Sequence, residues 1–186
     1  EVGIFSVEKN RLPFKKAFKV AKNSTYQQIT RVLSEPQLKK YVIDDSQYLL
    51  VNEMFDKAKD TGYGKFTDIA LRFRNMLDFV IRQMPDDTIV YFLHHTEVGA
   101  DGKLKAKTIG KMLDEKLTLE GTFNIVLRTA KENGEYFFLT QSDGNDTTKS
   151  PEEMFPERIP NDLAMVDKAI RDYYGLEEVT SGGTDS

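Results

Sequence analysis

The stretch Tyr41-Val42-Ile43-Asp44-Asp45 decides the fold, because a short apolar run flanked by charge is typical of a strand buried in a parallel sheet. Three further runs predict strands, over residues 2–7, 17–21 and 88–93. Apolar residues at helical spacing predict helices over residues 24–33, 49–58, 66–84 and about 161–173, with Ser24 and Asn161 as the capping residues of the first and last. This alternation of strands and helices predicts an α/β fold with a mostly parallel sheet flanked by helices.

A late pair of strands, over residues 122–129 and 135–140, is predicted to be antiparallel because the turn dipeptide Asn133-Gly134 lies between them. Residues 98–107 are polar and rich in Gly and Lys, so a mobile loop is expected there. A short helix is expected over residues 108–116, and an irregular stretch with three prolines over residues 142–160.

Length and composition predict a single domain over residues 1–175, followed by a polar, disordered tail over residues 176–186. The chain has no Cys and only two His, which excludes disulfides, thiolate metal sites and His-rich metal sites, and fits a reducing cytoplasm. No apolar run approaches ~18 residues, so no membrane span is predicted. Because the net charge is −4, any nucleic-acid surface must be local.

The two carboxylates at the end of the central run are the first candidate site. In parallel sheets, ligands bind at the carboxyl ends of the strands, where Asp44 and Asp45 are expected to lie. One carboxylate could hold Mg²⁺ and its neighbour could orient or deprotonate an attacking water molecule. The alternative is a strand that simply ends in two solvated acids.

His94-His95-Thr96 follows the next apolar run and forms the second candidate. A polar group at this strand end could sense a bound phosphate and pass its state to the following loop. Side chains of neighbouring residues alternate in direction, so at most one histidine is expected to face a ligand, and His95 or Thr96 is preferred. The alternative is a hydrogen-bonded structural histidine.

Lysines form two further candidates. Lys103, Lys105, Lys107 and Lys111 lie in the loop after the histidines and could each make a salt-sensitive contact with a nucleic-acid phosphate, although charge alone favours a solvated basic loop. Lys149, in a turn stiffened by a proline, could reach the nucleotide of a neighbouring subunit and stabilise transition-state charge. An ordinary surface lysine is the alternative.

A phosphate-cradling glycine loop is missing. Such a loop reads G-x-x-x-x-G-K-[ST] between a strand and a helix. Gly64-Lys65 is followed by Phe66, Gly110-Lys111 is followed by Met112, and a lysine stands at the first glycine position in both cases. The chain is therefore expected to bind nucleotide poorly by itself.

Five segments, in order along residues 2–174, together resemble the Walker B to C-terminal part of phage-encoded AAA-family, RecA-like P-loop ATPases. They are Lys40-Tyr41-Val42-Ile43-Asp44-Asp45-Ser46-Gln47-Tyr48, Tyr91-Phe92-Leu93-His94-His95-Thr96-Glu97, Lys107-Thr108-Ile109-Gly110-Lys111-Met112-Leu113-Asp114, Lys149-Ser150-Pro151 with Met154-Phe155, and Ile159-Pro160-Asn161-Asp162-Leu163. In that family the Walker A loop precedes these segments, so the resemblance implies an amino-terminally truncated ATPase.

The resemblance also implies roles. Asp44 would be the Walker B acid linked to Mg²⁺, Asp45 the catalytic acid, and His94 and His95 would occupy the sensor position. The loop that follows would face DNA, and Lys149 would match the lysine that RecA-type filaments insert into the neighbouring subunit's site. The implied cofactors are ATP and Mg²⁺, and the implied partners are single-stranded DNA and further copies in a ring or filament.

The residues and the resemblance together leave three functional hypotheses open. The first is an ATP-hydrolysing phage protein of DNA recombination, annealing or replication, acting in the cytoplasm of a bacterial host with phage or host replication proteins. The second is a non-catalytic RecA-like module that binds single-stranded DNA or a replication partner. The third is another AAA-type motor or a helicase loader, which would share the same nucleotide chemistry.

Overall fold

The computed structural model of the chain describes residues 1–8, 12, 14–15, 18–110, 112–113 and 117–176. The chain forms two compact units. The first comprises Glu1–Phe123 with Gly144–Thr147, and the second comprises Asn124–Asp143 with Thr148–Ser186. Apart from Leu176, the tail predicted over residues 176–186 lies outside the described residues.

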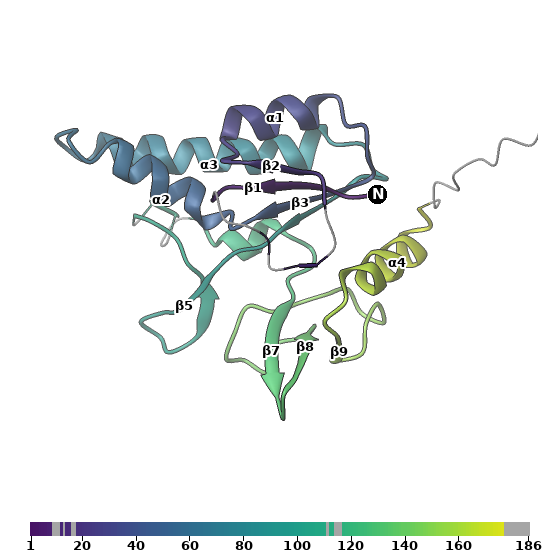
Figure 1. The fold of residues 1–186 in the computed structure, drawn as a ribbon. Helices are drawn as coiled ribbons and strands as arrows, with labels where there is room; N and C mark the ends of the chain where they lie inside the picture. Colours follow the sequence, from purple (N-terminus) through teal and green to yellow (C-terminus); the bar gives the residue numbers. More distant parts are fainter. Residues whose placement is uncertain (9–11, 13, 16–17, 111, 114–116, 177–186) are drawn as a thin grey trace, which may run out of the picture. The chain divides into compact units, whose positions relative to one another are not determined.

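A sheet of four parallel strands forms the centre of the first unit, in the order β2-β1-β3-β4 (Figure 1). The strands are β1 (Gly3–Ser6), β2 (Val20–Lys22), β3 (Lys40–Asp44) and β4 (Ile89–Phe92). The predicted α/β fold with a parallel sheet is confirmed. Three of the four apolar runs form strands close to their predicted bounds, whereas the strand predicted over residues 17–21 begins at Val20 and extends to Lys22. Because Ile43 pairs with Phe92, the carboxyl ends of β3 and β4 lie side by side.

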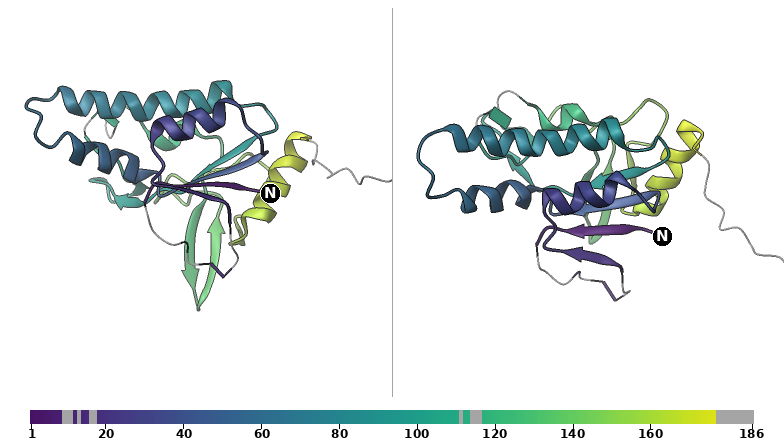
Figure 2. Two further views of the ribbon diagram at one scale, coloured as in Figure 1. Left: turned by 45° about the horizontal axis from the view of Figure 1, so that its top comes forward. Right: turned by 90° about the horizontal axis from the view of Figure 1, so that it is seen from above.

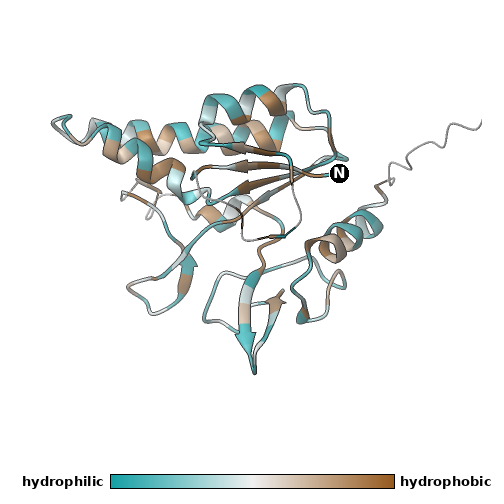
Figure 3. Ribbon diagram, viewed as in Figure 1, coloured by the Kyte–Doolittle hydropathy of each residue, from teal (hydrophilic) through white to brown (hydrophobic). Residues whose placement is uncertain are grey.

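One face of the sheet carries the core of the first unit. Phe5, Tyr41 and Ile43 are buried on this face, and the register places Phe5 beside Ile43. Side chains alternate between the two faces of a strand, so Ile4 and Val42 lie on the opposite face. Figure 3 shows β1 and β3 as mostly hydrophobic, whereas the helices carry both hydrophobic and hydrophilic residues. This pattern is expected of parallel strands packed beneath amphipathic helices.

Three helices flank the sheet: α1 (Tyr26–Ser34), α2 (Gln47–Asp56) and α3 (Gly64–Gln83). Figure 2 shows α3 running alongside both α1 and α2. Their apolar faces meet the sheet in one cluster, which includes Ile29, Leu33, Leu50, Phe73 and Leu77. Burial of this continuous apolar stripe, rather than helix propensity, accounts for most of the stability of such helices.

The start of α1 differs by one residue from the prediction. The capping box consists of Thr25 and Gln28, whose side chains each accept from the other's backbone N–H. Ser24, predicted as the capping residue, instead donates its hydroxyl to the Ala21 carbonyl at the end of β2. Tyr26, Ile29 and Leu33 are buried as the helical spacing predicts.

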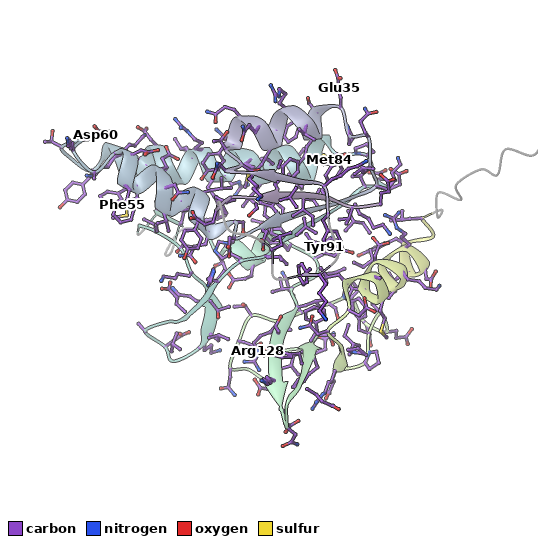
Figure 4. All side chains as sticks on the ribbon, viewed as in Figure 1. Glu35, Phe55, Asp60, Met84, Tyr91 and Arg128 are labelled. Carbon is purple, nitrogen blue, oxygen red and sulfur yellow. The ribbon has the colours of Figure 1, made fainter. Side chains whose placement is uncertain are left out.

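Helix α3 is the longest element and is amphipathic. The predicted stripe is confirmed at Ile69, Ala70, Phe73, Met76 and Leu77, which are buried, but Ile81 near the end of α3 is half exposed. Figure 4 marks Met84, which ends α3, and Asp60, which lies near the opposite end in the connection from α2. Among the residues that the structure describes, no helix is both long and apolar enough to cross a membrane.

The predicted mobile loop over residues 98–107 is in fact a β-hairpin. Strand β5 (Thr96–Val98) pairs antiparallel with β6 (Leu104–Ala106), and the turn between them contains Gly102 with a positive φ. Leu104, Lys105 and Ala106 alternate between apolar and charged side chains, as in a strand. The prediction of a loop was wrong because it relied on the content of Gly and Lys and overlooked this alternation. A 3₁₀ turn, η2 (Leu119–Thr122), precedes the end of this unit.

The described residues of the second unit form three antiparallel strands and one helix: β7 (Arg128–Glu132), β8 (Glu135–Leu139), β9 (Arg158–Pro160) and α4 (Leu163–Tyr174). The late antiparallel pair is confirmed, although its first strand begins at Arg128 rather than at residue 122. Asn133 and Gly134 both have positive φ, as a tight hairpin turn requires. The N-cap of α4 is Asp162 rather than Asn161.

Gly3 provides a test of the packing in the sheet. A Cβ atom at this position would lie 2.7 Å from Cδ1 of Tyr41, whose ring is buried and whose hydroxyl accepts from the Leu38 N–H. Gly3→Ala is therefore expected to lower the free energy of unfolding by about 1–3 kcal/mol, measured by urea denaturation. Gly64→Ala is the control, because a Cβ there meets nothing within 4 Å. Equal urea midpoints for the two variants would contradict this packing.

Candidate functional site

The two acidic residues lie at the carboxyl edge of the sheet. Asp44 is the last residue of β3, and Asp45 follows it with a φ of 58°, in the left-handed region. A residue other than glycine in this region costs about 1–3 kcal/mol and is common at functional sites. The turn carries the chain directly from β3 into α2 and leaves the Asp45 side chain about one-third exposed at the strand end.

His95 contacts Asp45 across this edge. Its Nε2 atom lies 3.1 Å from Oδ1 of Asp45, and its ring packs edge-on against Tyr48 of α2. The His95 side chain is half exposed, so the pair can be reached from solvent. The structure thus brings together two of the residues that the sequence predicts for the candidate site, although they are separated by 50 positions.

His94 points away from the acids and is engaged at both ring nitrogens. Nε2 lies 2.7 Å from the Lys107 carbonyl oxygen, and Nδ1 lies 2.9 Å from the Ser46 hydroxyl. Because a carbonyl can only accept, the Nε2 atom carries the proton, and Nδ1 of the neutral ring is an acceptor that competes with the Leu93 carbonyl for the single hydroxyl proton of Ser46. His94 therefore ties the start of α2 to the chain just after β6, and it leaves His95 as the histidine that faces the acids.

The pKa of His94 is held below its ordinary value of 6.5, chiefly because burial disfavours the charged ring. The Lys107 carbonyl and Glu120 raise the pKa, but by less than burial lowers it. The unfolded chain therefore binds the proton more readily than the folded chain does. Stability from this group is complete above about pH 6.5 and is lost as the pH falls through the folded-state pKa.

The lowered pKa of His94 predicts that the stability of the chain depends on pH. The free energy of unfolding is expected to fall below pH 6.5 with a contribution of at most about 1.4 kcal/mol per pH unit from His94. Urea denaturation at several pH values between 7.5 and 5 measures the slope. His94→Gln keeps a donor for the Lys107 carbonyl but cannot titrate, so its slope should be shallower. An unchanged slope in this variant would show that other groups control the dependence.

The pKa of Asp44 is raised, first by burial and then by the like charge of Asp45. A cation beside the two carboxylates would relieve both effects. Mg²⁺ is usually held by one or two carboxylates together with substrate phosphates, and Asp44 with Asp45 fits this mode. Among the described residues, no group of three or more His, Asp or Glu side chains could hold a metal ion.

Three of the predicted lysines lie along the second strand of the hairpin. Lys103, Lys105 and Lys107 are two positions apart, so their side chains leave the same face of the hairpin. Glu97 lies opposite Lys105 in the register and belongs to this face as well. Lys111, the fourth predicted lysine, lies outside the described residues. Lys103, Lys105 and Lys107 are called the lysine face below.

Two other predicted site residues, Thr96 and Lys149, belong to other elements of the structure. Thr96 is the first residue of β5 and pairs with Ala106, so it belongs to the hairpin rather than to the end of β4. Lys149 belongs to the second unit, where its backbone N–H and carbonyl both bond to Val126.

The Gly64-Lys65 pair does not form a phosphate loop. Gly64 and Lys65 begin α3 and are preceded by α2, whereas a phosphate loop connects a strand to a helix. A cleft of about 420 Å³ beside the ends of β1 and β2 does not substitute for one. Its charged lining residues are Glu8, Glu53, Asp56 and Arg72, an acidic set unsuited to phosphates.

Sequence reasoning missed two residues that support this edge. Ser46 binds the His94 ring, and its hydroxyl also lies 3.0 Å from the Leu93 carbonyl. Glu120 is buried, and its Oε1 atom accepts from the backbone N–H of Ala106 and from the Thr147 hydroxyl. Ser46 is adjacent to the acids and could have been suspected, but no sequence pattern marks Glu120.

In comparisons with known proteins, no family model, no curated protein and no solved structure matches the chain.

Proposed function

We propose that the chain is the acid-bearing part of a RecA-like ATPase that couples ATP hydrolysis to the handling of single-stranded DNA. The observation that carries this proposal is the contact between Asp45 and His95 at the carboxyl edge of adjacent parallel strands. Ligands of parallel sheets bind at this edge, and a carboxylate beside a polar strand end is what nucleotide hydrolysis requires. The resemblance to phage-encoded AAA-family ATPases supports the same assignment.

The residues at this edge would divide the chemistry. Asp45 would accept the proton of the attacking water or orient that water, and His95 would hold the Asp45 carboxylate in place. Asp44 would hold Mg²⁺, which when bound would neutralise charge that develops on the phosphate oxygens. His94 would act indirectly, since both of its ring nitrogens are engaged by Ser46 and Lys107.

The nucleotide phosphates would need a glycine-rich cradle, and the sequence contains no G-x-x-x-x-G-K-[ST] motif. Among the strands that the structure describes, β4 pairs with β3 alone, so its outer edge could pair with a further parallel strand that carries a glycine loop. In its absence, the chain should bind ATP weakly.

Single-stranded DNA would contact the lysine face of the hairpin. Lys107 follows β6 directly, and its carbonyl bonds to His94, so the hairpin is attached to the candidate nucleotide edge. In a ring or filament of copies, Lys149 would serve the nucleotide of a neighbouring subunit. These features suit a phage protein of DNA recombination, annealing or replication in the cytoplasm of its bacterial host.

ATP turnover with and without single-stranded DNA tests the proposal. The protein should be prepared as the present chain and as a form that also carries a phosphate-binding loop. The longer form is expected to hydrolyse ATP in the presence of Mg²⁺, and DNA should change the rate. Absence of turnover in a longer form that folds and binds ATP would overturn the enzymatic assignment.

A non-catalytic module that binds single-stranded DNA is the second candidate, and the combination of a lysine face with no phosphate loop favours it. Binding of DNA by the present chain, with the same affinity at saturating ATP and without ATP, would support this candidate. Dependence of that affinity on ATP in the longer form would support the ATPase.

A further inference from the structure

A buried carboxylate holds the hairpin that carries the lysine face. Glu120 lies in η2 and is buried, and its Oε1 atom is 2.6 Å from the Ala106 backbone nitrogen and 2.9 Å from the Thr147 hydroxyl. Both groups donate to the same oxygen. A buried carboxylate with two donors is a strong and directional contact.

The geometry of β6 explains why this contact matters. Strand β6 has two edges, and the N–H groups of Leu104 and Ala106 point away from β5. The Leu104 N–H donates to the Asn145 carbonyl, and the Ala106 N–H donates to Glu120. Glu120 therefore takes the place of a strand neighbour at the end of β6 where the hairpin joins the core.

The contact also lies beside the candidate nucleotide edge. Ala106 precedes Lys107, whose carbonyl accepts from His94, and whose N–H donates to the His95 carbonyl. The charge of Glu120 also reaches His94, because it is among the causes that raise the His94 pKa. One short stretch, Ala106-Lys107, is thus held from one side by the histidines and from the other by Glu120.

We propose that Glu120 is the positioning residue of the hairpin, fixing β6 so that the lysine face keeps a defined orientation beside Asp45 and His95. Its effect on nucleic acid rests on the proposed function, because it acts through Lys103, Lys105 and Lys107. The contact with Ala106 and Thr147 does not depend on that function, so the two can be tested separately.

Amide hydrogen exchange tests the contact itself. Glu120→Ala is expected to speed exchange at the Ala106 amide by about tenfold or more, because its N–H loses a buried acceptor. Glu120→Gln retains one carbonyl oxygen and should restore part of the protection, and Thr147→Val should have a smaller effect. If Glu120→Ala unfolds the chain, the other two variants still test the contact.

The pattern of exchange separates positioning from general stabilisation. Protection should fall at residues 104–107 while it persists in α1 and α3. The control is Glu53→Gln, which changes another buried glutamate whose ion pairs are with Lys57 and Arg72. It should leave residues 104–107 as protected as they are in the unchanged chain. Unchanged exchange at Ala106 in Glu120→Ala, or a uniform loss across the sheet, would overturn the proposal.

Binding of a fluorescent single-stranded oligonucleotide then tests the consequence. Glu120→Ala should weaken binding, and it should weaken it much less when Lys103, Lys105 and Lys107 have already been replaced by glutamine, since coupled sites are not additive. Additive effects would overturn the positioning role. If the unchanged chain and the lysine variant bind equally, the DNA part of the proposed function fails, while the exchange at Ala106 still decides the contact.

Discussion

Asp45→Asn is expected to lower ATP turnover by about 10²–10⁴-fold in the form that carries a phosphate-binding loop, because an amide cannot take a proton from water. The amide has the size of the carboxylate, so its oxygen can still accept from His95 Nε2, which lies 3.1 Å from Oδ1 of Asp45. The loss should therefore appear in kcat, with little change in KM. Steady-state phosphate release at several ATP concentrations measures both.

Asp44→Asn should act differently, through Mg²⁺. Binding of Mg²⁺ with ATP is expected to weaken, so that more Mg²⁺ is needed for half-maximal turnover. The variant should also be at least as stable as the unchanged protein near neutral pH. Because burial and Asp45 raise the Asp44 pKa, ionisation of Asp44 destabilises the folded state as the pH rises through that pKa. Typical substitutions instead destabilise by about 1 kcal/mol.

Asp86→Asn provides the matched control for both variants. Asp86 is exposed and precedes β4, so it lies at the amino edge of the sheet, opposite the candidate site. It should leave turnover and its Mg²⁺ dependence unchanged. Full turnover in both Asp44→Ala and Asp45→Ala would show that these acids are not the hydrolytic residues.

The strands and helices of the first unit could be predicted because their patterns are local and strong. The run before Asp44 is apolar on both faces, and α3 repeats its apolar residues over five turns, so burial leaves little choice of structure. The same reasoning failed for the hairpin of β5 and β6. Its strands are only three residues long, so each is too short for an alternation with a period of two to be recognised, and its lysines dominate the composition.

The candidate site could be predicted only in part, for a related reason. Asp44, Asp45 and His95 lie at the ends of strands, and the ends of strands can be predicted from the apolar runs that form them. Glu120 and Ser46 are placed by hydrogen bonds between segments far apart in the sequence, such as that from Ala106 to Glu120. No spacing within the chain encodes such a contact, so it becomes visible only once the tertiary structure is known.

The hairpin also explains how a chain with a net charge of −4 could bind a polyanion. Alternation along β6 and its flanks collects Lys103, Lys105 and Lys107 on one face, whereas Leu104 and Ala106 face the other way. Ala106 packs against the core of the first unit, which anchors the strand. A local field of this kind determines binding of nucleic acid more than the total charge does.

Reversing the charge of Lys103, Lys105 and Lys107 to glutamate together is expected to abolish measurable binding of single-stranded DNA near physiological salt. Each lysine that contacts a phosphate contributes about 0.7 to the slope of log affinity against log salt, so milder replacement of all three by glutamine should reduce the slope by about 2. Fluorescence anisotropy with a labelled oligonucleotide, from 50 to 200 mM salt, measures the affinity and the slope.

Charge reversal at Lys15, Lys22 and Lys59 is the control for the glutamate variant, because it changes the net charge by the same amount at exposed positions outside the hairpin. A chain that binds through its lysine face should retain most of its affinity in this control. Equal losses in both triple variants would mean that binding follows total charge, and the hairpin would then have no special role. A loss confined to the lysine face, together with the reduced salt slope, would place the phosphate backbone on β6, next to the residues that hold Asp45.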